Sequence, residues 1–284
     1  MSSLYVIFKR ELRDFVFAER FFSKRFLLYL ALIFLPVVLM AVVVNIFNTP
    51  SGLERISALY PEPIIALTAA FAMMFYICAA AGLSFTLVAI IHSGNFVAGE
   101  QTSGTLSLLV SKPIRRWKII IGKYLAFLAI LIPLILLAVG SMALLVYAMG
   151  IGAVSGKVFL GFLVTAVGIG AVYTSIGTLF SSMTKNSLMA ILGAFIFMLG
   201  WFMFDFIIVY LPENIANVIK HGLVGYHTNT ISAYISGGEA TLKMMHAPGE
   251  GLTAFFGSLI FILLLVIVPV VASVVVLQKR DIHG

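Results

Sequence analysis

The chain has 284 residues, of which 62% are hydrophobic and only 10% are charged, with a formal net charge of +7. Soluble domains carry about 25% charged residues, so this composition excludes an ordinary soluble protein. The mean hydropathy of +1.13 indicates an all-α integral membrane protein. Membrane spans and short loops use most of the length, so we treat residues 1–284 as a single transmembrane domain.

Residues 1–25 are apolar at helical spacing but are interrupted by charges every few positions. Leu4, Phe8, Leu12 and Phe15 form the repeating apolar positions. This pattern predicts an amphipathic helix that lies in the cytoplasmic interface of the membrane. The charges run through the whole segment, which is not the pattern of a signal peptide. Two roles stay open for this helix, which are membrane anchoring and docking of a partner.

Six further segments are long and apolar enough to cross a membrane, since a span needs about 20 residues. The first of them contains Pro36 and the third contains Pro133, and neighbouring helices can accommodate such prolines. An even number of spans places both termini on the same side. The predicted spans are residues 26–47, 64–91, 124–149, 158–180, 187–211 and 252–277.

Most of the 18 lysines and arginines lie on one side of these spans. They occupy the N-terminal segment, the loop between the second and third spans, Lys185 and the pair Lys279-Arg280. Cytoplasmic loops retain positive charge, so both termini are expected in the cytoplasm of a multi-pass cell (plasma) membrane protein. The basic residues follow the membrane boundary, which points to membrane lipids and a cytosolic partner and not to nucleic acid.

Residues 92–123 form the longest basic and polar interruption between two spans. Apolar and polar residues alternate through residues 95–110, which predicts short helical pieces at the membrane surface. A new helix is expected near Pro113, because proline suits the first turn of a helix and the residue before it avoids helical geometry. The segment therefore predicts a helix, a turn and a second helix that projects into the cytosol; a connector pinned to the membrane surface is the alternative.

The order of residues in this segment resembles the permease subunits of ABC-2 type transporters. The residues that carry this resemblance are, in chain order, Glu100, Gly104-Thr105-Leu106, Pro113, Arg116 and Gly122-Lys123. Similar features continue at Gly177, at Leu179-Phe180-Ser181-Ser182 and at Lys279-Arg280-Asp281. The resemblance implies an ABC-2, type V exporter-like, transmembrane fold with six spans. It also implies pairing with a second permease copy or a related permease.

The same resemblance implies cytosolic ABC ATPase subunits as partners, with residues 92–123 acting as a coupling segment. The function it implies is that of a permease subunit that couples ATP hydrolysis on a separate chain to substrate export. Basic residues at the start of the third span would contact lipid headgroups. The implied ATPase-coupling residues are Glu100, Gly104, Thr105, Leu106, Pro113 and Arg116, and the implied membrane-interface residues are Arg115, Lys118 and Lys123.

The sequence contains no motif that would let the chain supply its own energy. The pair Gly156-Lys157 comes nearest to a P-loop. It is followed by Val158, whereas a P-loop requires serine or threonine at that position. ATP and magnesium are therefore expected on the partner ATPase, and no cofactor is expected on this chain. Motifs of zinc proteases and serine hydrolases are also absent from the sequence, so an enzyme is not expected.

The outer loop, residues 212–251, carries histidines and glutamates that could in principle bind a metal. The spacing of His221, His227 and His246 matches no compact ligand motif, so we interpret them as scattered, solvated side chains and predict no metal site.

Asp205 is the only acidic residue within a predicted span. A charge in the bilayer is costly, so Asp205 should face a partner helix or a water-filled path. It either belongs to a substrate path or is a hydrated residue near the outer end of the fifth span. A secondary transporter or channel not driven by ATP is the alternative function, but such proteins usually carry more ionisable groups within their spans.

Overall fold

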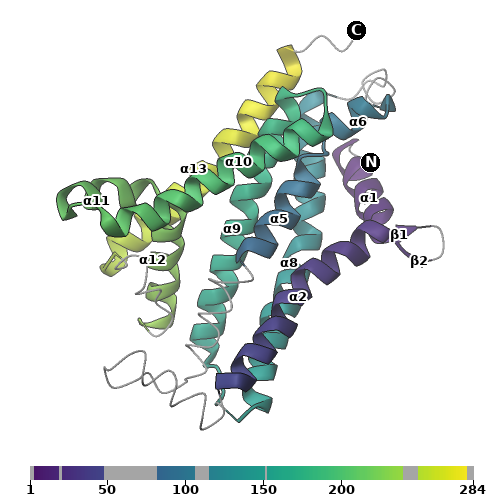
Figure 1. The fold of residues 1–284 in the computed structure, drawn as a ribbon. Helices are drawn as coiled ribbons and strands as arrows, with labels where there is room; N and C mark the ends of the chain where they lie inside the picture. Colours follow the sequence, from purple (N-terminus) through teal and green to yellow (C-terminus); the bar gives the residue numbers. More distant parts are fainter. Residues whose placement is uncertain are drawn as a thin grey trace.

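The structure is a computed structural model that describes residues 3–18, 21–47, 82–105, 115–150, 152–238 and 249–279. These parts are helical except for short connections and one antiparallel pair of two-residue strands, β1 (Phe17–Ala18) and β2 (Phe21–Phe22). The helices are α1 (Ser3–Val16), α2 (Lys24–Phe47), α5 (Gly82–Ser93), α6 (Ala98–Thr102), α8 (Arg116–Ala148), α9 (Gly156–Met183), α10 (Ser187–Ile207), η2 (Ile208–Tyr210), α11 (Glu213–Ile219), η3 (Lys220–Gly222), α12 (Val224–Ser236) and α13 (Gly251–Lys279) (Figure 1).

Within the described residues, four helices are long and apolar enough to cross a membrane. They cover Arg116–Ala148, Gly156–Met183, Ser187–Asp205 and Gly251–Lys279, so the chain is a multi-pass membrane protein. The first predicted span, residues 26–47, lies within α2, and the end of the second forms α5. Residues 48–81 lie outside the described parts, and the total of six spans stays a prediction.

The helix expected near Pro113 begins at Arg116 and continues without a break through Pro133 to Ala148. At a rise of about 1.5 Å per residue, its 33 residues measure about 50 Å, whereas the apolar core of a bilayer is about 30 Å thick. Several turns of α8 therefore extend beyond the membrane core. Pro113 itself lies outside the described residues.

Helix α9 lies at the centre of the bundle and contacts α5, α8, α10, α12 and α13. Its glycines face different neighbours at close range. A Cβ at Gly170 would lie 2.9 Å from Leu131 Cδ2 of α8, and one at Gly161 would lie 3.0 Å from Ser232 Oγ of α12. A Cβ at Gly177 would overlap the Ser93 hydroxyl of α5. The sequence of α9 thus allows three helices to approach its backbone.

The described part of the predicted outer loop, residues 212–251, folds into α11, η3 and α12. Helix α12 packs against both α9 and α13, although its sequence is polar. Its buried threonines donate hydrogen bonds to carbonyls one turn back, as Thr228 does to Val224 and Thr230 does to Tyr226. Internal bonding of this kind explains why polar side chains can be buried there.

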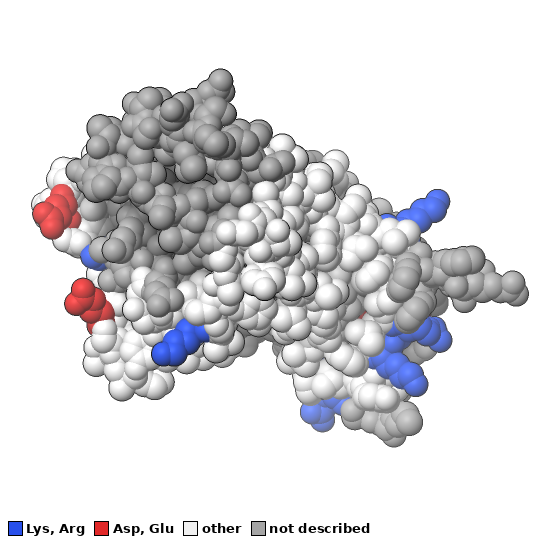
Figure 2. All heavy atoms as spheres, turned by 90° about the horizontal axis from the view of Figure 1, so that it is seen from below, with Lys and Arg blue, Asp and Glu red and all other residues white. Residues whose placement is uncertain are grey.

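The charges lie toward the sides of the molecule in the view of Figure 2. Red side chains lie at the left of this view, on the side where Figure 1 places α11, and most of the blue side chains lie at the right, on the side of α1. Both described ends of the chain, α1 and the end of α13, lie at the same end of the bundle as α6 (Figure 1).

The close approach of α5 to α9 yields a stability prediction. Gly177→Ala should lower the free energy of unfolding by about 1–3 kcal/mol, because the added methyl group overlaps the Ser93 hydroxyl and well-packed cores resist added volume. Thermal unfolding of the detergent-purified protein measures the effect. Gly168→Ala is the matched control on the same helix, since its Cβ would lie 3.9 Å from Thr228 and make ordinary contact. Equal unfolding temperatures for the two variants would contradict the predicted packing.

Candidate functional site

A side chain from α9 accepts hydrogen bonds from the backbone at the start of the short helix α6. Ser181 Oγ accepts hydrogen bonds from the backbone N–H groups of Val97 and Ala98, both at 3.0 Å. The same hydroxyl donates to the carbonyl oxygen of Gly94 at 2.8 Å. The first N–H groups of a helix have no partner within the helix, so Ser181 supplies the missing acceptor from another element. The start of α6 is therefore fixed to α9.

A second set of bonds holds α6 against the turn between α9 and α10. Thr102 Oγ1 lies 2.7 Å from the carbonyl oxygen of Ala98 and 3.3 Å from that of Lys185. Ser187 donates a hydrogen bond to the side-chain oxygen of Asn95. The end of α6 and the residues just before its start are thus attached to the region where α9 leads into α10.

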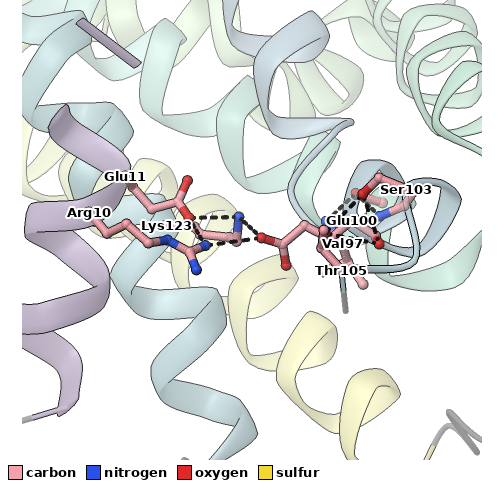
Figure 3. Close-up of polar contacts among 9 residues, drawn as sticks. Arg10, Glu11, Val97, Glu100, Ser103, Thr105 and Lys123 are labelled. Carbon is pink, nitrogen blue, oxygen red and sulfur yellow. Dashed lines mark hydrogen bonds and ion pairs between the residues drawn. The ribbon is translucent and has the colours of Figure 1, made fainter. Parts of the chain in front are cut away.

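Four charged side chains from three helices meet beside α6 (Figure 3). Lys123 Nζ of α8 lies 2.8 Å from Glu100 Oε1 of α6 and 3.1 Å from Glu11 Oε1 of α1. Arg10 Nη2 lies 2.8 Å from Glu11 Oε1 and 3.3 Å from Glu100 Oε1. We call Arg10, Glu11, Glu100 and Lys123 the charge cluster. Its two cations and two carboxylates have no formal net charge.

The interior position of the cluster strengthens these ion pairs. The Lys123 side chain is only 5% exposed and that of Glu100 14% exposed. Burial by itself would raise the pKa of the Glu11 carboxyl, but the charge of Lys123 and hydrogen bonds from Arg10 and Lys123 outweigh burial, so the pKa is lowered. Burial would lower the pKa of Arg10, but its contacts with Glu11 and the charge of Glu100 raise it. The charged forms of Glu11 and Arg10 are therefore favoured.

Helix α1 reaches the cluster because its apolar face packs on α8. Ile7 and Ile119 are buried against each other, and a Cβ at Gly122 would lie 2.9 Å from Ile7 Cγ2. This face of α1 is covered by protein in the structure. Its location in the membrane interface stays a prediction.

The structure separates the residues that were predicted to contact an ATPase. Glu100 points into the charge cluster, whereas Gly104 and Thr105 are exposed at the tip beyond α6. Arg116 donates hydrogen bonds to the carbonyl oxygens of Leu277 at 2.8 Å and Gln278 at 3.1 Å, at the negative end of the α13 dipole. Leu106 and Pro113 lie outside the described residues.

The residues predicted at the membrane interface also differ in their positions. Arg115 is exposed at the start of α8, and the Lys118 ammonium lies 5.7 Å from the centre of the Trp117 ring. Lys123 is not placed for headgroup contact, because it is buried between two carboxylates that compensate its charge. Only Arg115 and Lys118 thus keep positions compatible with the expected interface.

Sequence reasoning did not identify Arg10, Glu11 or the bond from Ser181 as parts of this site. Glu11 carries a signal, since it lies four residues after Ile7 on the face that packs on α8, where an acidic residue is unexpected. Ser181 belongs to the Leu179-Phe180-Ser181-Ser182 stretch, but its spacing from residues 94–98 could not predict a contact. The tertiary fold brings these distant segments together.

Asp205 and His227 occupy protein-lined positions away from the cluster. Asp205 is 8% exposed, and a Cβ at Gly225 of α12 would lie 3.0 Å from its Oδ1 atom. Asp205 thus faces α12, and its role in a substrate path stays a prediction. His227 is 6% exposed and lies 2.9 Å from both Ser258 Oγ and the His221 carbonyl oxygen, so its interpretation as a solvated histidine is wrong.

Removal of the central cation should destabilise the fold. Lys123→Met leaves the largely buried carboxylates of Glu100 and Glu11 with one cation fewer, and the expected loss in the free energy of unfolding is about 3 kcal/mol. Chemical unfolding in detergent measures it. The double variant Lys123→Met/Glu100→Met removes an entire ion pair and should be more stable than Lys123→Met alone. If the double variant loses the sum of both single effects, Lys123 and Glu100 are not energetically coupled.

The lowered pKa of Glu11 predicts a pH dependence. The ionised carboxylate contributes stability above its ordinary pKa of 4.5, and this contribution falls as the pH drops through the lowered pKa of the folded state. Glu11→Gln should therefore unfold at a lower temperature than the parent at neutral pH. This difference should shrink below pH 4.5. Asp14→Asn, an exposed control on the same helix, should show little difference at either pH, and a constant gap for Glu11→Gln would contradict the prediction.

Comparison with known proteins supports the resemblance found in the sequence. The sequence model of a family described as ABC-2 family transporter protein matches residues 5–282. A search of curated proteins finds no match. The matched region includes most of α1, all of α6, the charge cluster and the four described helices that are long and apolar enough to span a membrane. The chain therefore belongs to the ABC-2 transporter family.

Proposed function

We propose that this chain is the permease subunit of an ATP-driven exporter in the cell membrane. A separate cytosolic ATPase binds ATP and magnesium, and a second copy of this chain or a related permease completes the translocation pathway. Both termini and α6 face the cytosol in this proposal. Family membership supports the permease role, and the basic residues near α1, α6 and the start of α8 support the orientation.

The attachment of α6 is the observation that carries the proposal. A helix of five residues is too short to be stable by itself, so its rigidity must come from its neighbours. Ser181 ties it to α9, and Glu100 ties it to Lys123 of α8 and Arg10 of α1. The tip, residues 102–105, is exposed. A force applied to that tip would reach three helices through defined bonds.

The residues near α6 have different roles in this mechanism. Gly104 and Thr105 contact the ATPase, together with Leu106 and Pro113. Glu100 transmits the motion of α6 to α8 through Lys123. Arg116 extends the connection to α13 through its bonds to the last carbonyls of that helix, while Arg115 and Lys118 hold the start of α8 at lipid headgroups.

Gentle detergent purification from native membranes tests the partnership directly. We expect an ABC ATPase to co-elute in a fixed ratio with this chain, and we expect transport to require ATP. A chain that elutes without an ATPase and transports at an unchanged rate would instead be a secondary carrier or channel.

A variant at the exposed tip tests the role of α6. Gly104 has a φ of 73°, a backbone conformation that valine rarely adopts, so Gly104→Val should change the turn that carries Thr105. We expect ATP-driven transport to fall by about tenfold, a typical scale for coupling between sites.

The matched control for this variant is Gly237→Val. Gly237 ends α12 with a φ of 67°, so valine there introduces similar backbone strain away from α6. Both variants should lose similar stability in thermal unfolding, but only Gly104→Val should lose ATPase binding or coupling. Equal transport by the two variants would remove the coupling role from the tip of α6.

A further inference from the structure

A hollow that the mechanism above does not use is lined by residues of α1. Its volume is about 300 Å³, and its described lining residues are Tyr5, Val6, Lys9, Arg10 and Arg13. These positions share one side of the helix, because residues separated by four positions lie above one another. The opposite side, which includes Ile7, packs on α8. The described lining residues therefore lie on the side of α1 that does not pack on α8.

The hollow combines cationic and apolar side chains. Tyr5 is 48% exposed and Val6 is 55% exposed, so both present apolar surface. Lys9 is exposed, and Arg13 pairs with Asp14 at 3.1 Å while both side chains remain more than half exposed. An ion pair this exposed is weak and screened by solvent, so the guanidinium can bind another anion. Figure 2 shows basic side chains gathered on the side where Figure 1 places α1.

We propose that this hollow binds the headgroup of an anionic phospholipid. The Lys9 ammonium attracts the phosphate as a compact charge, and the planar Arg13 guanidinium donates hydrogen bonds to it. Val6 and the Tyr5 ring contact the adjoining lipid carbons. A lipid fits better than free phosphate because two of the lining residues present apolar surface, which inorganic phosphate does not use. Helix α2 exposes Leu27 and Leu28 in its first turns, so apolar surface continues along the chain after α1.

Arg10 connects this lipid site to the charge cluster. Its side chain lines the hollow and also contacts Glu11 at 2.8 Å and Glu100 at 3.3 Å. A lipid phosphate would compete for Arg10, and the longer contact with Glu100 would weaken first. Lipid binding would then loosen one of the bonds that hold α6. This regulatory consequence rests on the proposed coupling function, whereas the lipid site itself does not.

Binding to the purified full-length chain tests the site without an ATPase. Native mass spectrometry in detergent would compare short-chain phosphatidylglycerol, short-chain phosphatidylcholine and inorganic phosphate as probes. We expect one phosphatidylglycerol to bind about thirtyfold more tightly than phosphatidylcholine, from two basic contacts near an anionic group. Lys9→Gln/Arg13→Gln should abolish this preference.

The matched control is Lys185→Gln/Lys279→Gln, which removes two exposed charges elsewhere in the described chain and should keep the preference. An equal loss in the control would show diffuse charge attraction and overturn the site. Inorganic phosphate that binds as tightly as phosphatidylglycerol, or a double variant that keeps its preference, would also overturn it. If the double variant lowers the unfolding temperature, Lys9→Gln alone carries the test, with an expected loss of about fivefold.

Discussion

The buried ammonium group of Lys123 determines how three helices assemble. A cation removed from water loses several kcal/mol of hydration free energy, and attraction to nearby carboxylates must compensate this loss. Glu100 and Glu11 lie 2.8 Å and 3.1 Å from Lys123 Nζ, and they come from α6 and α1. Helix α8 can bury this lysine only when both other helices are docked. The ion pairs therefore specify the positions of α1 and α6 more than they add net stability.

This constraint holds the short helix α6 rigidly against its neighbours. Its start is held by Ser181 of α9 and its middle by the charge cluster, while residues 102–105 remain exposed. Arg116, two turns before Lys123 on α8, bonds to the end of α13. A displacement of α6 thus has defined routes to α1, α8, α9 and α13. Such a network suits a permease subunit that receives work from a separate ATPase.

The sequence predicted the helices better than the contacts between them. Apolar length predicted the four described helices that can span a membrane, and proline chemistry predicted a helix that starts near Pro113 and continues into a span. Charge counting treated Lys123 as a boundary residue, because pairing with Glu11 and Glu100 depends on segments far apart in the sequence. The polar residues of α12 gave no sign in the sequence that this helix is buried. It can be buried because its threonines donate hydrogen bonds to carbonyls of their own helix.

The coupling function requires that the exposed tip of α6 faces the cytosol, where an ATPase can reach it. The most direct measurement is labelling of Ser103→Cys with a membrane-impermeant maleimide, after replacement of the sole cysteine, Cys78, by serine. We expect no labelling in intact cells and complete labelling in inside-out vesicles. Labelling in intact cells would place α6 on the outer surface and contradict the coupling function.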